Sequence, residues 1–290
     1  MRRIFHFLIL ASLFSCGRVS NNSSEKIITV SIAPFKYFVE EIGGSDFKVN
    51  VMVPAGADPH TYEPFPEQII ELRKSIAYIS NGYLGFEMNW LDRFYEINSK
   101  MKRLSLGDKI DPMSSGHLHE GGHVEAADPH YWVSPRSALI IASSVNSFLC
   151  GLNPAEKNKY ETNYEALVLK IKEVDTKALK LFSGLTNKSF MIYHPNLAYL
   201  ARDYNLEEIP VEYEGKEPPP SRIRELIDRA RRDKIKVIFV QREYDTKNAK
   251  AIASEIGARV EIIDPLSEDW QRETTDIINA VHNSLIESLK

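Results

Sequence analysis

The hydrophobic pattern of this 290-residue chain predicts strands that alternate with helices. A continuous apolar run, typical of a strand buried on both faces of a parallel sheet, occurs at 27–33, and further strand candidates lie at 49–54, 76–80 and 102–107. Between these runs, apolar side chains recur at helical spacing over 34–44, 66–75 and 86–97. The first half of the chain is therefore predicted to form an α/β lobe with a parallel sheet, spanning residues 26–152.

The same order of elements restarts in the second half of the chain. Strands are predicted at 189–193, 208–213, 236–241 and 259–264. Helices are predicted between and beside them at 196–205, 220–234 and 248–257. We therefore predict a second α/β lobe, also with a parallel sheet, over residues 184–290.

A single long helix is predicted between the two lobes, over residues 153–183. Its start, Asn153-Pro154-Ala155-Glu156, has the pattern of a capping box with proline at the first helical position. From Tyr160 to Leu181, apolar residues recur at alternating steps of four and three, which places them on one face. A helix of about 28 residues is ~42 Å long, which suits a rigid connection between lobes. A coiled-coil partner helix is the alternative.

The amino-terminal segment has the order of residues found in a bacterial lipoprotein signal. Arg2 and Arg3 precede an apolar run that is too short to span a bilayer, and the sequence LFSC ends at Cys16. We predict a signal peptide over 1–15 and a lipid anchor on Cys16, followed by a polar tether over 16–25. An ordinary signal cut elsewhere and a buried amino-terminal helix are the alternatives. The other cysteine, Cys150, lies in the apolar sequence SFLCGL and is predicted to pack in the core.

Composition and charge narrow the classes of function. The chain has 36 basic and 40 acidic residues, a net charge of -4, and no strong cluster of positive charge, which disfavours nucleic-acid binding. Its hydrophobic fraction of 43% predicts a folded protein. The sequence contains no G-x-S-x-G, P-loop, C-x-x-C or H-E-x-x-H motif, so common enzyme signatures are missing and we do not expect an enzyme.

Three histidines lie where predicted strands end or on stiff loops. His60 and His130 each close an Asp-Pro-His triplet on a proline-bearing loop, and His194 follows a strand and opens a helix. Ligands of parallel α/β sheets bind outside the carboxyl ends of the strands, so these are positions for binding residues. Asp58 is expected to accept a backbone N–H bond and fix the His60 loop. The structural alternatives are a surface turn for His60 and a capping or core role for His194.

A carboxylate occupies the corresponding position after the last predicted strand. Asp264 completes a set of two candidate ligands from each half, and three imidazoles with one carboxylate suit Zn²⁺. Four protein ligands leave no position for a reactive water, which favours holding the metal over catalysis. A zinc hydrolase with Glu63 as the general base is the alternative from another class.

Three more histidines lie in the sequence SSGHLHEGGHVEAAD, which has no apolar periodicity and is predicted to be a flexible loop. His117, His119 and His123 give this loop a metal-collecting composition, and we expect an auxiliary, weaker metal site there. A solvated loop that happens to contain histidine is the alternative.

Taken together, these segments resemble the metal-binding solute receptors of ABC importers, in the branch that takes up zinc or manganese. The resemblance runs through VSIAPFKYFVEEIGG, PAGADPHTYEP, ADPHYWV, HPNLAYLARDYNL, GKEPPPSRIRELID and IDPL. It implies two lobes joined by a backbone helix, with the metal held in the cleft by the residues matching His60, His130, His194 and Asp264. It also implies an extracytoplasmic, lipid-anchored and monomeric receptor that delivers metal to a membrane permease.

The resemblance also bears on the identity of the metal. Manganese-binding members often carry a carboxylate where this chain has His194, so the imidazole favours zinc. Mn²⁺ or Fe²⁺ remains the alternative cargo, because in vitro preference among divalent metals does not identify the physiological one. An adhesin is a further alternative within the resemblance, although no exposed motif supports it.

Overall fold

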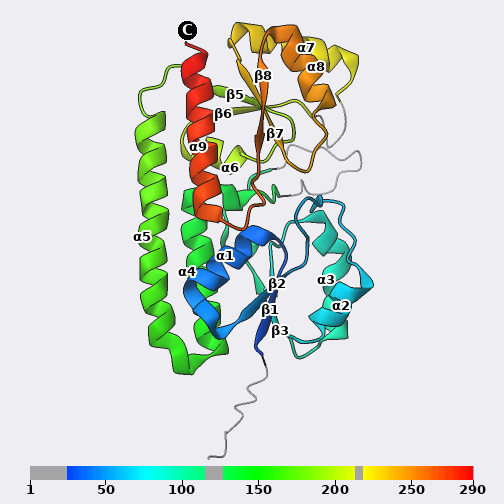
Figure 1. The fold of residues 1–290 in the computed structure, drawn as a ribbon, viewed down its shortest axis with the longest axis vertical. Helices are drawn as coiled ribbons and strands as arrows, with labels where there is room; N and C mark the ends of the chain where they lie inside the picture. Colours follow the sequence, from blue (N-terminus) through cyan, green and yellow to red (C-terminus); the bar gives the residue numbers. More distant parts are fainter. Residues whose placement is uncertain (1–24, 115–126, 213–217, 290) are drawn as a thin grey trace, which may run out of the picture.

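The computed structural model describes residues 25–114, 127–212 and 218–289. These residues form two α/β lobes, each built on a four-stranded parallel sheet, with a long helix running beside both (Figure 1). The arrangement confirms the predicted fold class. The predicted signal peptide, Cys16 and the histidines of the 115–126 segment lie outside the described residues.

The amino-terminal lobe has the strand order β2-β1-β3-β4, with all pairs parallel. Its strands are β1 (Ile27–Val30), β2 (Lys48–Val51), β3 (Ser75–Ser80) and β4 (Lys102–Ser105). Its helices are α1 (Ala33–Gly43), α2 (Pro66–Leu72), α3 (Gly85–Ile97) and α4 (Pro135–Leu152). The helices α1 and α4 lie on one side of the sheet, and α2 and α3 lie on the other (Figure 1).

The carboxyl-terminal lobe repeats this topology with the order β6-β5-β7-β8. Its strands are β5 (Ser189–Ile192), β6 (Glu207–Pro210), β7 (Val237–Gln241) and β8 (Arg259–Ile263). Its helices are α6 (Ala198–Asp203), α7 (Pro220–Arg232), α8 (Lys247–Ile256) and α9 (Trp270–Glu287). The two sheets therefore follow the same winding order, as the repeated pattern of strands and helices predicts.

The central strands of the second lobe are buried on both faces, which explains their uninterrupted apolar sequence. On β7, Val237 and Phe239 point into one core, and Ile238 and Val240 point into another on the opposite face. Successive side chains of a strand point to opposite faces, so both sets must be apolar when helices cover both sides.

The first of these cores is continuous through both lobes. It joins side chains of α1, α4, α5 (Lys157–Phe182) and α9 with strands of both sheets. The buried face of α5 includes Tyr160, Leu167 and Ile171, as the stepped apolar pattern predicts. Because one layer of helices packs on both sheets, we expect the lobes to move little relative to each other.

Two local details of the connecting region differ from the sequence prediction. The capping box at Asn153 is wrong: a short 3-10 turn (Pro154–Glu156) precedes α5, and the Asn153 side chain donates to the hydroxyl of Tyr160 instead. The pattern also gave no sign of α4, whose buried face contains Ser137 and Ser144 among its apolar residues. Small polar residues on the inner face blur the helical period on which such a prediction depends.

Among the described residues, no single helix is both long and apolar enough to cross a bilayer. The helices Pro135–Leu152 and Pro154–Phe182 are long and apolar enough only when they are taken together, by length and composition alone, and the chain bends by 119° between them.

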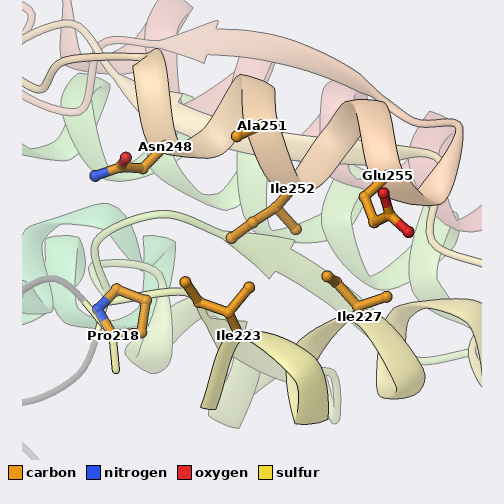
Figure 2. Close-up of a pocket in the computed structure, with 7 residues that line it drawn as sticks. All are labelled: Pro218, Ile223, Ile227, Asn248, Ala251, Ile252 and Glu255. Carbon is orange, nitrogen blue, oxygen red and sulfur yellow. The ribbon is translucent and has the colours of Figure 1, made fainter. Parts of the chain in front are cut away.

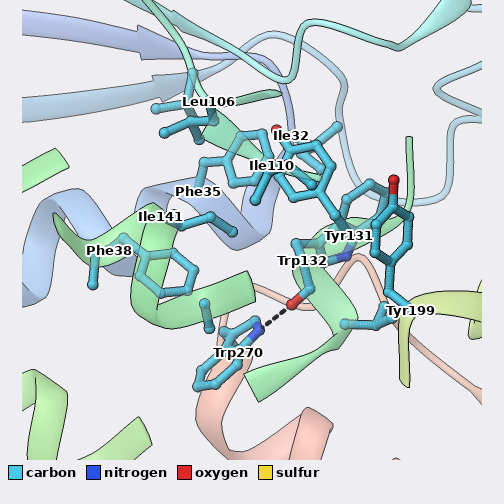
Figure 3. Packing of buried hydrophobic residues seen from close by; sticks show 14 of the residues in the cluster. Ile32, Phe35, Phe38, Leu106, Ile110, Tyr131, Trp132, Ile141, Tyr199 and Trp270 are labelled. Atoms are coloured by element: carbon cyan, nitrogen blue, oxygen red, sulfur yellow. Dashed lines mark hydrogen bonds between the residues drawn. The ribbon is translucent and has the colours of Figure 1, made fainter. Parts of the chain in front are cut away.

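A pair of tryptophans ties the end of the second sheet to the first lobe (Figure 3). The indole N–H of Trp270 donates to the carbonyl of Trp132 at 2.7 Å, and the indole N–H of Trp132 donates to the carbonyl of Pro265 at 2.8 Å. Both tryptophans are buried, with Trp270 packed against Phe38. Buried donors that keep their partners fix the position of the backbone segments they join.

We predict that Trp270→Phe lowers the free energy of unfolding by about 1–3 kcal/mol, because the Trp132 carbonyl loses a buried donor. Urea denaturation measures the change. Trp90→Phe on α3 is the matched control, since the Trp90 ring is only partly buried and packs within the first lobe. Equal losses in both variants would contradict a special contribution from the Trp270 bond.

A largely buried carboxyl group supports the turn that follows β5. Oε1 of Glu208 accepts the backbone N–H groups of Asn196 and Leu197, at 3.1 Å and 2.7 Å. Burial raises the pKa of Glu208 from 4.5 to about 8. The adjacent Glu207 has the opposite shift, because its bonds to Arg229 lower its pKa.

The contribution of Glu208 to stability therefore decreases as pH rises. Its folded pKa exceeds the unfolded value, so the folded state retains a proton that the unfolded state releases between about pH 4.5 and 8. We predict that Glu208→Gln flattens this decline in unfolding free energy, measured by denaturant titration from pH 5 to 9. Glu207→Gln is the control, and a decline of unchanged slope in Glu208→Gln would refute the assignment.

Candidate metal site

The candidate ligands lie at the carboxyl ends of the two sheets. His60 is in the loop between β2 and α2, and His130 lies after β4, immediately before the 3-10 turn Tyr131–Val133. In the second lobe, His194 follows β5 and Asp264 follows β8. Since the carboxyl ends of parallel strands share one edge of their sheet, the folding of each lobe gathers its own candidates.

The structure brings three imidazoles from the two lobes together. Nε2 of His60 lies 3.1 Å from Nε2 of His130 and 3.2 Å from Nε2 of His194. Nitrogen ligands of a tetrahedral zinc ion, each at about 2.0–2.1 Å, are separated by about 3.3 Å. The three donor atoms thus have the chemistry of a zinc site, and the two separations from His60 nearly match the edges of a zinc tetrahedron.

Aspartates fix both Asp-Pro-His loops through the same contact. Oδ1 of Asp58 accepts the backbone N–H of His60 at 2.9 Å, which confirms the predicted role of Asp58. Oδ1 of Asp128 accepts the backbone N–H of His130 at 2.8 Å in the same way. The repeated triplet is therefore a repeated local structure.

Asp128 has a second contact with the imidazole of His130. Nδ1–H of His130 donates to Oδ1 of Asp128 at 2.8 Å, and the ring packs on Trp132. Only 4% of His130 is exposed. A proton held on Nδ1 leaves the Nε2 lone pair directed at the other two histidines, as metal coordination requires.

His194 has a carboxylate partner from the neighbouring strand. Its Nδ1–H donates to Oε2 of Glu212, just beyond β6, at 2.5 Å, and its ring stacks on Tyr244 with centroids 4.8 Å apart. Burial lowers the pKa of His194 despite the opposing effect of Glu212. The imidazole is therefore neutral at neutral pH, with Nε2 available to a cation.

Asp264 has a different environment from the three histidines. Its Oδ2 accepts from Nη1 of Arg242 at 2.7 Å, and its backbone N–H donates to Oε1 of Glu273 at 2.9 Å. The group of donor atoms lying within 4.8 Å of one another consists of the three imidazoles, without Asp264, among the described residues. Asp264 as the fourth ligand thus remains a prediction.

Glu63 and Cys150 were also singled out from the sequence, whereas Glu212 was not. Glu63, considered as a general base, is exposed and lines a hollow of about 270 Å³ beside His60, together with Arg93. Cys150 is partly buried and packs against the core. Glu212 was missed because the predicted strand 208–213 includes it, whereas β6 ends at Pro210 and leaves Glu212 beyond the strand.

A separate groove between α7 and α8 has the wrong chemistry for a metal (Figure 2). Its walls include Ile223, Ile227 and Ile252, and its volume is about 310 Å³. Glu255 at its edge pairs with Arg231. The polar donors that suit a divalent cation are therefore gathered at the three histidines and not in this groove.

The chain is similar in sequence to known metal-binding proteins. The zinc-binding lipoprotein AdcA of Streptococcus pneumoniae is 25% identical over 284 residues, which cover 92% of this chain and 56% of AdcA. The iron-binding protein YfeA of Yersinia pestis is 27% identical over 267 residues, which cover 88% of this chain and 84% of YfeA. The chain spans about half the length of the streptococcal relatives.

Structural comparison agrees with these sequence matches. A crystal structure of ZnuA has a TM-score of 0.84 and 37% sequence identity, covering 90% of this chain and 99% of that one. The model of the family described as zinc-uptake complex component A, periplasmic, matches residues 28–286. The chain therefore belongs to the ZnuA family of metal-binding proteins.

Proposed function

We propose that this protein is an extracytoplasmic receptor that captures Zn²⁺ and delivers it to the permease of an ABC-type importer. The proposal includes a lipid anchor on Cys16 that holds the receptor at a membrane, and His60, His130, His194 and Asp264 as the ligands of the metal. A further, weaker metal site at His117, His119 and His123 belongs to the same proposal.

The approach of Nε2 of His60 to Nε2 of His130 and of His194, at 3.1 and 3.2 Å, is the observation that carries the proposal. Membership of the ZnuA family and the similarity to a zinc-binding lipoprotein support it. Outer carboxylates on His130 and His194 support it as well, because Nδ1–H bonds of this kind orient imidazole ligands and increase their basicity.

The donor set favours zinc over the alternative cargoes. Three imidazoles suit a borderline-soft cation, whereas Mn²⁺ prefers oxygen ligands. The similarity to an iron-binding protein keeps Fe²⁺ as the second candidate. Growth rescue of a strain lacking the transporter, with zinc, manganese or iron supplied separately, distinguishes the candidates because it reports the metal that is delivered.

We predict that His60→Ala, His130→Ala and His194→Ala each weaken zinc binding by more than about a hundredfold, because each removes a direct donor. Loss of an outer-shell partner typically costs 10- to 100-fold, so loss of a ligand should exceed that range. Equilibrium dialysis with competing Zn²⁺ and Mn²⁺ at neutral pH measures the effect.

His282→Ala is the matched control, since His282 lies on α9 and contacts Phe182, away from the three imidazoles. Its zinc affinity should equal that of the wild-type chain. Zinc binding that survives in all three site variants would contradict the proposed function.

We predict that Glu212→Ala weakens zinc binding by about 10- to 100-fold, because the His194 ring loses the partner that fixes its tautomer. Glu212→Gln should lose less, since an amide oxygen still accepts from Nδ1–H. Glu255→Gln on α8 serves as the control. The same dialysis measures all three, and an unchanged affinity in Glu212→Ala would show that His194 needs no outer support.

A further inference from the structure

Arg242 and Asp264 form an ion pair whose position is set by the pairing of two strands. Gln241 at the end of β7 lies in register with Ile263 at the end of β8, and the backbone N–H of Arg242 donates to the carbonyl of Ile263 at 3.1 Å. The residues that follow these two strands, Arg242 and Asp264, therefore lie side by side. Nη1 of Arg242 lies 2.7 Å from Oδ2 of Asp264 as a result.

The backbone around Asp264 is held on both sides. The Asp264 N–H donates to Oε1 of Glu273, and the following Pro265 carbonyl accepts from the indole of Trp132. Trp132 in turn packs on the ring of His130 with centroids 5.4 Å apart. The backbone next to Asp264 is thus linked through Trp132 to the ring of His130, and a change of partner by the carboxylate would be a change of side-chain rotamer.

The two members of the pair differ in exposure. The Asp264 side chain is 16% exposed, whereas the Arg242 side chain is 65% exposed. An ion pair with such an open partner is screened by water and contributes little. A divalent cation held by three imidazoles therefore competes well with this guanidinium for the carboxylate.

We propose that Arg242 competes with the metal for Asp264 and thereby lowers the affinity of the site for the metal. This inference rests on the proposed function and concerns the same site. The guanidinium holds the carboxylate until a metal ion takes its place, and it is positioned to take the carboxylate back when the metal leaves. The arginine thus lowers the affinity of a site that has to release its cargo.

The test is a double-mutant cycle on zinc affinity, measured with a competing chelator on the purified full chain. Arg242→Gln should tighten zinc binding about two- to fivefold, the range that removal of an exposed ion pair allows. Arg242→Lys, which keeps a cation beside Asp264, should stay close to wild type. Asp264→Asn should weaken binding, and adding Arg242→Gln to it should cause no further change.

A matched control distinguishes this effect from the general removal of positive charge. Arg272 on α9 is similarly exposed and pairs with Asp269, so Arg272→Gln should leave zinc affinity unchanged. Thermal unfolding of each variant confirms that the chain remains folded, which is expected because Arg242 lies largely in solvent.

Three results would overturn the inference. Unchanged or weaker binding in Arg242→Gln would show that the arginine does not compete. Equal tightening in the Asp264→Asn background would show that Arg242 acts through its overall charge and not through Asp264. Unchanged binding in Asp264→Asn would remove Asp264 from the site. Each of these leaves the proposed zinc receptor intact as long as the three histidine variants lose zinc, although the third removes Asp264 from its proposed ligands.

Discussion

Three imidazole nitrogens directed at one another are the constraint on which the site depends. Lone pairs at 3.1–3.2 Å repel unless a proton or a cation lies between them, and a divalent cation can accept all three nitrogens as ligands at once. The protein imposes it through Asp128 and Glu212, which hold the protons of His130 and His194 on the far side of each ring. These two hydrogen bonds therefore hold the rings of His130 and His194 in an orientation that suits a divalent cation.

The fold maintains this arrangement across two lobes. One apolar core runs through α1, α4, α5 and α9 to both sheets, and the Trp132–Trp270 bonds join the loop of His130 to the start of α9. Rigid lobes favour a preformed site, in which little conformational entropy is lost when the metal binds. Release of the metal then requires a change within the site. In our proposal, the Asp264 carboxylate makes that change when it returns from the metal to Arg242.

Much of this arrangement followed from residues that are local in sequence. The apolar runs predicted both sheets. The strand ends and the repeated Asp-Pro-His triplet predicted His60, His130 and His194, because parallel sheets collect loop residues at one edge. The partners of His194 and Asp264 could not be predicted, because they depend on contacts between segments that are distant in sequence. Glu212 meets His194 only through the pairing of β5 with β6, and Arg242 meets Asp264 only through the register of β7 with β8. The helix α4 was not predicted, because buried serines interrupt its apolar face.

The most direct test is a crystal grown with zinc, with anomalous diffraction recorded on both sides of the zinc absorption edge. The account predicts one strong peak between the lobes, at about 2.0–2.1 Å from Nε2 of His60, His130 and His194. A zinc peak at another place, or rings of the three histidines that point apart with no ion between them, would contradict the account.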